Sequence, residues 1–164
     1  MTQALLAELT RLMQYDPKTG VFTRIVSSSP KAQAGAVAGN LGPRGYWHIG
    51  VLGKNYLAHR LAWLCTHGEL PLIGIDHENR IRHDNRLLNL RLATVKQNAE
   101  NQTKNTTNIS GEKGVTWRRD TYKWQAQIEH NGRCHYLGCF IDINEASAAY
   151  KKAAAKLFTH YTRI

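Results

Sequence analysis

The sequence predicts an α+β protein in which a strand-rich first part precedes a small three-stranded antiparallel sheet packed on one helix. Three observations predict this class. Apolar residues recur at helical spacing from Leu5 to Met13, alternating strand patterns flank the turn signal Asn131-Gly132, and an Ala- and Lys-rich stretch follows at 145–158. The 164 residues suffice for one ordinary domain or two small ones, and 42% hydrophobic residues can supply a core.

The first part combines helical and extended patterns up to about residue 68. Pro and Gly punctuate the turn that follows the first helix, and β-branched and aromatic residues mark the strands. In order, we expect a turn at 16–20, a strand at 21–26, a Ser-, Ala- and Gly-rich stretch at 27–42, strands at 46–51 and 55–58, and a helix at 59–66.

The middle of the chain is polar around a few apolar anchors. A short strand is expected at 72–75, and Thr94 with Gln97 three residues later predicts a helix over 95–101. The Thr- and Asn-rich stretch that follows is the best candidate for a linker. We therefore expect one domain at 1–103, a linker at 104–110 and a second domain at 111–164.

The formal net charge of +10 is spread along the whole chain, so the folded body itself is expected to be basic. Nucleic acid is the commonest partner of such a surface, although a ribosomal or membrane-surface protein would also fit. No apolar run is long enough to span a bilayer, and the N-terminus lacks the features of a signal peptide. Three cysteines without a CxxC pair argue against structural zinc and disulfides, so a reduced cytoplasmic setting is expected.

The densest polar information lies between residues 76 and 98. Phosphodiester hydrolysis needs a general base, a Lewis acid and a group that holds the base. His77 can take a proton near pH 7, and Asn89 can fix its tautomer. Asp76 and Asn98 carry oxygen ligands that suit Mg²⁺. Taken singly, an Asp-His pair or an Asn-rich loop is more often a polar turn or a helix cap.

The order of these residues resembles the HNH endonuclease family, in the phage and intron branch where Asn replaces the last His. Asp-His at 76–77, Asp-Asn-Arg at 84–86, Asn-Leu-Arg at 89–91 and Asn98 carry the resemblance. Upstream, Tyr-Asp-Pro-Lys-Thr-Gly at 15–20 and the segment 56–63 extend it, so that it covers roughly residues 8–103.

The resemblance implies a ββα-metal unit, with its core at about 56–103, around one divalent ion. Mg²⁺ is the expected ion, with Mn²⁺ as the alternative, and no structural zinc is expected. His77 matches the general base and Asn89 the residue that orients the base or the phosphate. Asp76 and Asn98 match the metal ligands, and Arg91 matches a residue that contacts phosphate or supports the fold. The Asp-Asn-Arg turn is interpreted as mainly structural.

Two further histidines fall near this pattern. His59, at the start of a helix, is expected to pack or cap rather than to bind metal, and His83 lies in the active loop without a family counterpart.

Residues 111–164 suggest binding rather than catalysis. Alternation along the strands predicts an outward face that can lie in the major groove of DNA, where Arg and Gln match purine edges and phosphates. A solvated face without partner is the plain alternative. The expected contact residues are Thr116, Arg118, Gln125, Gln127, Arg133 and Tyr136.

The same segment resembles the plant ethylene-response-factor (APETALA-like) type of DNA-binding domain. The runs Gly-Val-Thr-Trp at 114–117, Lys-Trp-Gln-Ala-Gln-Ile at 123–128 and Glu-Ala-Ser-Ala-Ala-Tyr at 145–150 carry this resemblance. It implies three strands packed on one helix, with the sheet reading the major groove. Family members usually offer several Arg on the sheet, whereas Thr116, Gln127 and Glu129 stand here, so the target sequence differs from the family's pattern.

Together these features predict a metal-dependent DNA endonuclease, of the kind encoded by phages or homing mobile elements, acting on double-stranded DNA. No membrane and no obligate protein partner are expected. The rival hypotheses are a DNA-binding regulator that keeps the nuclease scaffold without catalysis, and an RNA-binding protein, because a basic sheet also serves RNA.

Overall fold

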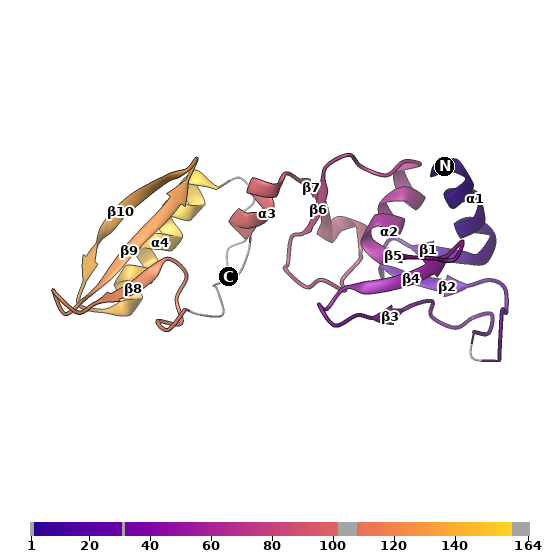
Figure 1. Cartoon of the computed structure of the whole chain (residues 1–164), viewed down its shortest axis with the longest axis horizontal. Coiled ribbons are helices and arrows are strands. Elements are labelled where there is room, and N and C mark those ends of the chain that lie inside the picture. Colours follow the sequence, from indigo (N-terminus) through magenta and orange to yellow (C-terminus); the bar gives the residue numbers. More distant parts are fainter. Residues whose placement is uncertain (1, 31, 102–107, 159–164) are drawn as a thin grey trace. The chain divides into compact units, whose positions relative to one another are not determined.

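The computed structural model describes residues 2–30, 32–101 and 108–158, which belong to two compact units, Met1–Thr94 and Val95–Ile164 (Figure 1). The described residues form four α-helices and several small antiparallel sheets, a mixed α+β architecture as expected. Most of the expected linker, residues 104–107, lies outside the described residues. None of the helices described is long and apolar enough to cross a lipid bilayer.

The first unit is built from three small sheets and two helices. The sheet orders are β1-β2, β3-β4-β5 and β6-β7, with antiparallel pairing throughout. Its elements are α1 (Thr2–Leu12), β1 (Met13–Asp16), β2 (Val21–Arg24), β3 (Asn40–Leu41), β4 (Trp47–Val51), β5 (Lys54–Leu57), α2 (Ala58–His67), β6 (Gly74–His77), the 3-10 turn η1 (Leu87–Asn89) and β7 (Leu90–Ala93).

The turn between β1 and β2 is held by its own polar side chains. The Asp16 carboxylate accepts hydrogen bonds from the Lys18 N–H at 2.9 Å and the Thr19 hydroxyl at 2.8 Å, and the Gly20 N–H donates to the Asp16 carbonyl at 2.8 Å. An Asp that closes a turn onto the backbone two residues later is a common local motif. The expected Pro- and Gly-marked turn therefore forms at 16–20.

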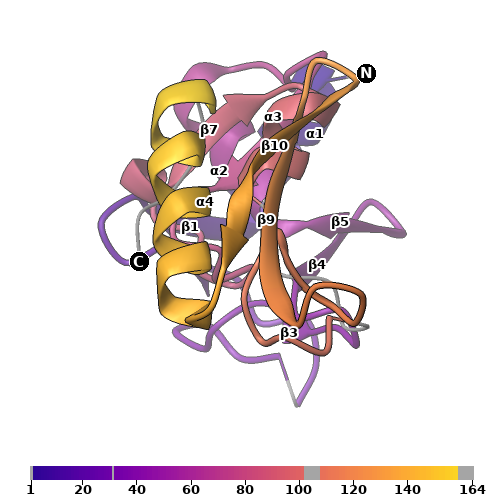
Figure 2. The same ribbon diagram turned by 90° about the vertical axis from the view of Figure 1, so that its left-hand side faces the viewer.

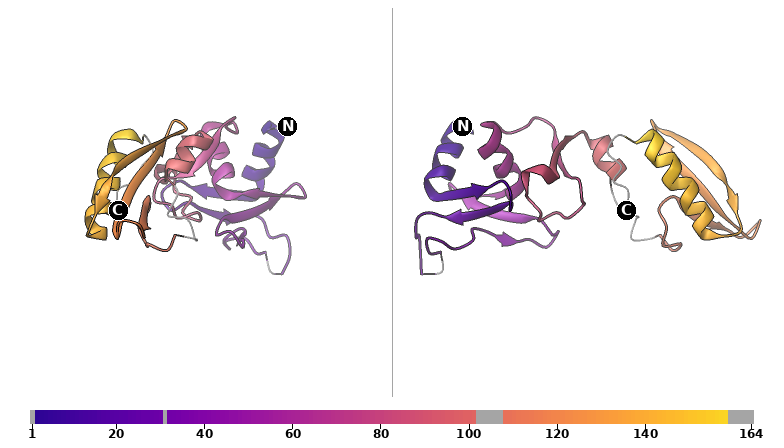
Figure 3. Two further views of the ribbon diagram at one scale, coloured as in Figure 1. Left: turned by 60° about the vertical axis from the view of Figure 1, so that its left-hand side comes forward. Right: turned by 180° about the vertical axis from the view of Figure 1, so that it is seen from behind.

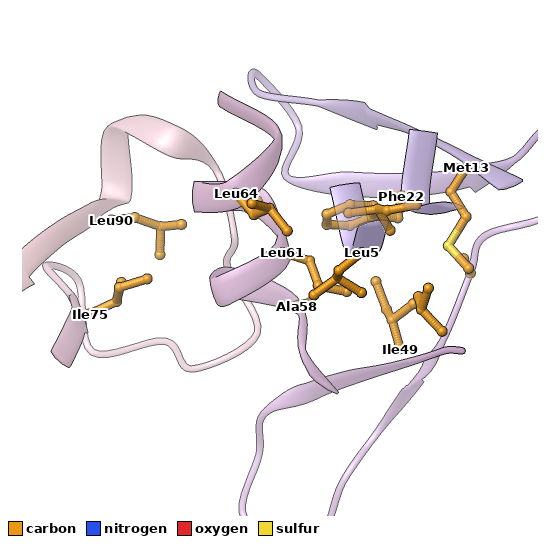
Figure 4. Packing of buried hydrophobic residues seen from close by; sticks show 13 residues of the cluster. Leu5, Met13, Phe22, Ile49, Ala58, Leu61, Leu64, Ile75 and Leu90 are labelled. Atoms are coloured by element: carbon orange, nitrogen blue, oxygen red, sulfur yellow. The ribbon is translucent and has the colours of Figure 1, made fainter. Parts of the chain in front are cut away.

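One hydrophobic core joins the N-terminal hairpin to β6 and β7. Leu61 and Leu64 of α2 are fully buried and lie between Ile75 and Leu90 on one side and Phe22 on the other (Figure 4). Large apolar side chains at two positions of one helix face bury against both neighbours at once. Through this core, α2 supports the strand that ends in His77.

The second unit contains a helix, a three-stranded sheet and a longer helix. The sheet order is β10-β9-β8, and Asn131 and Gly132, both with positive φ, form the two-residue turn between β9 and β10. This is the conformation that an Asn-Gly pair favours in tight hairpins. Its elements are α3 (Val95–Asn101), β8 (Val115–Arg118), β9 (Lys123–His130), β10 (Arg133–Phe140) and α4 (Ile143–Leu157).

Helix α4 covers one face of this sheet (Figures 2 and 3). Ala126 and Ile128 of β9 are buried against Ala146 and Tyr150 of α4. The small alanines let the helix approach the strands closely. The alternate side chains of each strand point to the opposite face of the sheet, away from α4.

Candidate active site

The β6-β7 hairpin carries the expected catalytic pair at the end of a strand. Asp76 pairs with Arg91 and His77 with Leu90 across the two strands. Because successive side chains point to opposite faces, His77 shares the face of Ile75, which packs in the core, and Asp76 lies on the other face. Both side chains are buried, His77 to 3% exposure.

The side chain of Asn85 lies against the imidazole of His77. Asn85 Oδ1 lies 3.4 Å from His77 Nε2, while Asn85 Nδ2 donates to the His83 carbonyl at 3.2 Å. The second bond orients the amide so that its oxygen faces the ring. An amide oxygen only accepts, so Nε2 carries the proton and the lone pair of the neutral imidazole lies on Nδ1.

Burial favours the neutral form of His77. Loss of hydration lowers the pKa of His77 below its ordinary value, because the charged form loses more than the neutral form when water is removed. The ring of His59 meets His77 edge-on with 5.0 Å between centroids, and the ring of Tyr46 lies 6.0 Å away. A neutral imidazole is the form that can accept a proton from water.

The carboxylate of Asp76 is held by Arg91. Arg91 donates from Nη2 at 2.9 Å and from Nε at 3.1 Å to the same oxygen, Oδ2 of Asp76. Two charge-assisted bonds from one guanidinium set the carboxylate's orientation. This geometry favours the supporting alternative for Arg91, whose guanidinium also lies 4.0 Å from the Glu78 carboxylate.

The side chain of Asn89 fastens the loop that follows β6. Asn89 Oδ1 accepts from the Asn79 N–H at 2.9 Å, and Asn89 Nδ2 donates to the Asp84 carbonyl at 2.8 Å. The loop is closed further by Asp84, whose carboxylate accepts from Asn79 Nδ2 at 2.6 Å and from Arg86 Nη2 at 2.6 Å. These bonds lower the pKa of Asp84 to about 2, the Arg86 bond contributing most.

The structure thus places Asn85, rather than Asn89, against the imidazole of His77. Asn89 braces the loop, whereas Asn85, from the Asp-Asn-Arg turn, reaches His77. Within this turn, the bonded pair Asp84 and Arg86 therefore stabilises the loop, while the middle residue, Asn85, points toward His77. Spacing alone cannot separate the two roles, because both asparagines are buried and both follow the same strand.

The remaining expected residues of this region are distributed over both units. Asn98 lies half-buried on α3 in the second unit, and Asp76 lies in the first. His59 is buried in the first turn of α2, and His83 is exposed, with its carbonyl bonded to Asn85. Within residues 2–30, 32–101 and 108–158, no group of three or more His, Cys, Asp or Glu side chains is placed to hold a metal ion.

The outer face of the C-terminal sheet gathers most of the expected contact residues. Register pairs Thr116 with Gln125 and Gln127 with Tyr136, so these four side chains share the face away from α4. Arg118, two residues beyond Thr116, joins them and bonds Asp120 from Nη2 at 3.0 Å. The face is therefore polar, with one exposed tyrosine.

Arg133 is placed differently from the expectation. It pairs with His130, two residues beyond Ile128, which puts it by register on the helix side of the sheet at the hairpin end. Arg133 is three residues before Tyr136 in a regular stretch of β10, so alternation along the strand places the two side chains on opposite faces. The irregularity between Tyr136 and Gly138 comes after both residues and affects only the rest of the strand.

Comparison with known proteins gives a family match for a segment that includes the β6-β7 hairpin. Residues 56–100 match the model of the HNH endonuclease family. Protein 3.8 of Escherichia phage T7 is 32% identical over 78 residues, which make up 47% of this chain. The chain spans 64% of the length of that relative. No solved structure matches the chain significantly.

Proposed function

We propose that this protein is a metal-dependent DNA endonuclease that hydrolyses phosphodiester bonds with His77 as general base. The observation that carries the proposal is a buried imidazole at a strand end, in contact with Asn85 and next in sequence to a carboxylate, inside the segment that matches the HNH endonuclease family. The phage relative supports a phage or mobile-element setting, in which a homing endonuclease is the proposed biological role.

In the proposed reaction, Nδ1 of His77 accepts a proton from water as the oxygen attacks phosphorus in line. Asn85 holds Nε2–H and so keeps the lone pair on the reacting nitrogen. Asn89 and Asp84 keep the loop that carries Asn85 in one conformation. The bond from phosphorus to the 3′ oxygen breaks and the leaving oxygen takes a proton from solvent water, so that hydrolysis leaves a 5′-phosphate and a 3′-hydroxyl. The step requires a base that is held in position.

The chain offers oxygen donors of the kind that a hard cation prefers. Asp76 supplies a carboxylate and Asn98 an amide oxygen, and both are ligand types of Mg²⁺, with Mn²⁺ as the alternative. When bound, the metal would stabilise the negative charge that develops on the phosphate and on the leaving 3′ oxygen. Arg91 would keep the Asp76 carboxylate oriented toward it.

The C-terminal unit is proposed to bind duplex DNA through the outer face of its sheet. Support comes from the shared face of Thr116, Gln125, Gln127 and Tyr136 and from the resemblance to the ethylene-response-factor type of domain. Two weakly binding units on one chain raise each other's effective concentration at the DNA. The unit would thereby supply affinity and coarse specificity to the nuclease.

Cleavage of supercoiled plasmid by the purified full chain tests the nuclease. With Mg²⁺ or Mn²⁺ we expect nicked or linear product, none with EDTA, and a fall in kcat of about 10²- to 10⁴-fold in His77→Ala. His67→Ala is the matched control, because it removes an exposed imidazole that stacks on Trp63 in α2. Circular dichroism of both variants verifies that they fold.

Two results would overturn the proposal. Salt-sensitive DNA binding without cleavage under any metal would favour the non-catalytic DNA-binding regulator. Cleavage that survives His77→Ala undiminished would mean that another residue is the base.

A further inference from the structure

We propose that Tyr15, on the N-terminal hairpin, is a positioning residue that sets Asn85 and, through it, the general base His77. The inference rests on the proposed nuclease function and extends its machinery to residues 15–20, outside the segment that matches the HNH endonuclease family. The contact joins residues 70 apart in the sequence.

The hydroxyl of Tyr15 reaches the backbone of the active loop. It donates a hydrogen bond of 2.7 Å to the carbonyl of Asn85. The ring itself is fixed by packing, since it lies 4.8 Å from the ring of Phe22, a fully buried core residue on β2. A phenol whose ring is immobilised by a core can hold its partner in one place at little further entropic cost.

The turn after Tyr15 also contacts the next two residues of the same loop, Arg86 and Leu87. The Leu87 N–H donates to the Pro17 carbonyl at 3.0 Å. Gly20, with φ of +75°, packs so closely that a Cβ there would stand 2.4 Å from the Arg86 nitrogen. The backbone of three consecutive residues, Asn85 to Leu87, therefore lies against the hairpin.

The last link, from Asn85 to His77, is sensitive to small displacements. At 3.4 Å, the Asn85 Oδ1···His77 Nε2 contact is near the long limit of a hydrogen bond. Movement of the Asn85 backbone by a few tenths of an ångström would lengthen it beyond bonding. Without this bond, neither the tautomer nor the orientation of the His77 ring would be fixed, although the imidazole itself would still be present.

Tyr15→Phe removes only the hydroxyl and tests the role directly. We expect kcat of metal-dependent plasmid cleavage by the full chain to fall about tenfold, since misplacement of a catalytic group by an ångström can cost about 10²-fold. KM should change less than about twofold, because Tyr15 contacts no DNA in this scheme. If the wild-type chain cleaves DNA and Tyr15→Phe has the same kcat, the positioning role is overturned and the proposed function stands.

Tyr56→Phe is the matched control. Tyr56 of β5 packs against the same core, and its hydroxyl makes no hydrogen bond to the part of the chain that the structure describes. Its loss should leave kcat unchanged. An equal fall of kcat in both variants would attribute the effect to core packing and overturn the proposal.

A double-mutant cycle with Asn85→Ala separates positioning from general destabilisation. Asn85→Ala removes the side chain through which Tyr15 would position His77. In that background Tyr15→Phe should therefore lower kcat by less than about twofold. The same tenfold fall in both backgrounds would overturn the route through Asn85. A wild-type chain that never cleaves, by contrast, would count against the proposed function itself.

Discussion

His59 shows how strongly burial can change a side chain that its local sequence leaves ordinary. The ring is 6% exposed, and its Nδ1 makes no hydrogen bond within the described residues. Burial is the main cause that lowers its pKa to about 3, and electrostatic coupling to His77, Arg60 and His48 lowers it further, because each of these groups repels a second positive charge whenever it is protonated. His59 is thus neutral at pH 7 and packs against the ring of His77, in line with the packing role expected for it.

Stability should therefore depend on the protonation of His59. Its folded pKa is below the unfolded value of 6.5, so the unfolded chain binds the proton more tightly. The free energy of unfolding is expected to fall as pH is lowered from about 6.5 toward 4, and to fall less steeply in His59→Leu. Urea unfolding at a series of pH values, followed by tryptophan fluorescence, measures both slopes.

The control for this experiment is His67→Leu, which removes an exposed histidine of the same helix. Asp84, with a pKa of about 2, loses its contribution only at lower pH and does not disturb the window. Equal slopes in wild type and His59→Leu would contradict the assignment.

Helix α4 illustrates how one local contact begins an element. Asp142 is its N-cap, and its Oδ1 accepts from the Asn144 N–H at 2.8 Å. This satisfies one of the amide groups that the first turn leaves without a partner.

Removal of this cap should weaken the C-terminal unit. Asp142→Ala is expected to lower the free energy of unfolding by about 1 kcal/mol, because an orphan N–H loses its acceptor. Asp142→Asn keeps an acceptor of the same size and should stay within about 0.5 kcal/mol of wild type. Thermal and urea unfolding of the full chain compare the variants, and equal losses in both would show that charge, not capping, is responsible.

The predicted positions of elements with strong local sequence signals agree well with the structure. Elements with weak local signals are missing from the prediction. The helices at 2–12 and 58–67 and the hairpin around Asn131-Gly132 lie within a few residues of their predicted positions. Strands β1 and β7 are not predicted. β1 continues an apolar helical pattern, and β7 is short, so only pairing with β2 and β6 makes them extended.

The basic charge of the whole chain predicts salt-sensitive binding to duplex DNA. A chain of net charge +10 that neutralises phosphates releases counterions, so affinity falls as salt rises. Arg118, on the outer sheet face, is expected to contribute one such contact. Its partner Asp120 lies on the turn after β8 and would compete with phosphate for the guanidinium.

Arg118→Ala should reduce the slope of log Kd against log salt by about 1 and weaken binding at low salt. Fluorescence anisotropy on duplex DNA, with His77→Ala in the background to prevent cleavage, measures the slope. Arg11→Ala is the matched control, since Arg11 is an exposed arginine bonded to Glu8 in α1. Equal slopes in wild type and Arg118→Ala would exclude a phosphate contact there, and stronger competition by RNA than by DNA would favour the RNA-binding hypothesis.

Local rules determine much of this protein before it folds. Neighbouring residues in the chain determine the turns at Asp16 and at Asn131-Gly132 and the alternation of β9. The order of Asp76, His77 and the asparagines is visible in the sequence itself and indicates an HNH endonuclease domain, which residues 56–100 match. Such features depend on dihedral preference and side-chain period, which a few consecutive residues set.

Tertiary structure decides which groups meet at the site. The sequence predicts that Asn89 orients the base or the phosphate, whereas the path of the loop turns Asn85 toward His77 and Asn89 closes the loop. The contact from Tyr15 to Asn85 spans 70 residues and depends on a core that packs α2 between two hairpins. Long-range contacts of this kind arise only when apolar faces are buried together, because burial, rather than local preference, selects the relative position of distant segments.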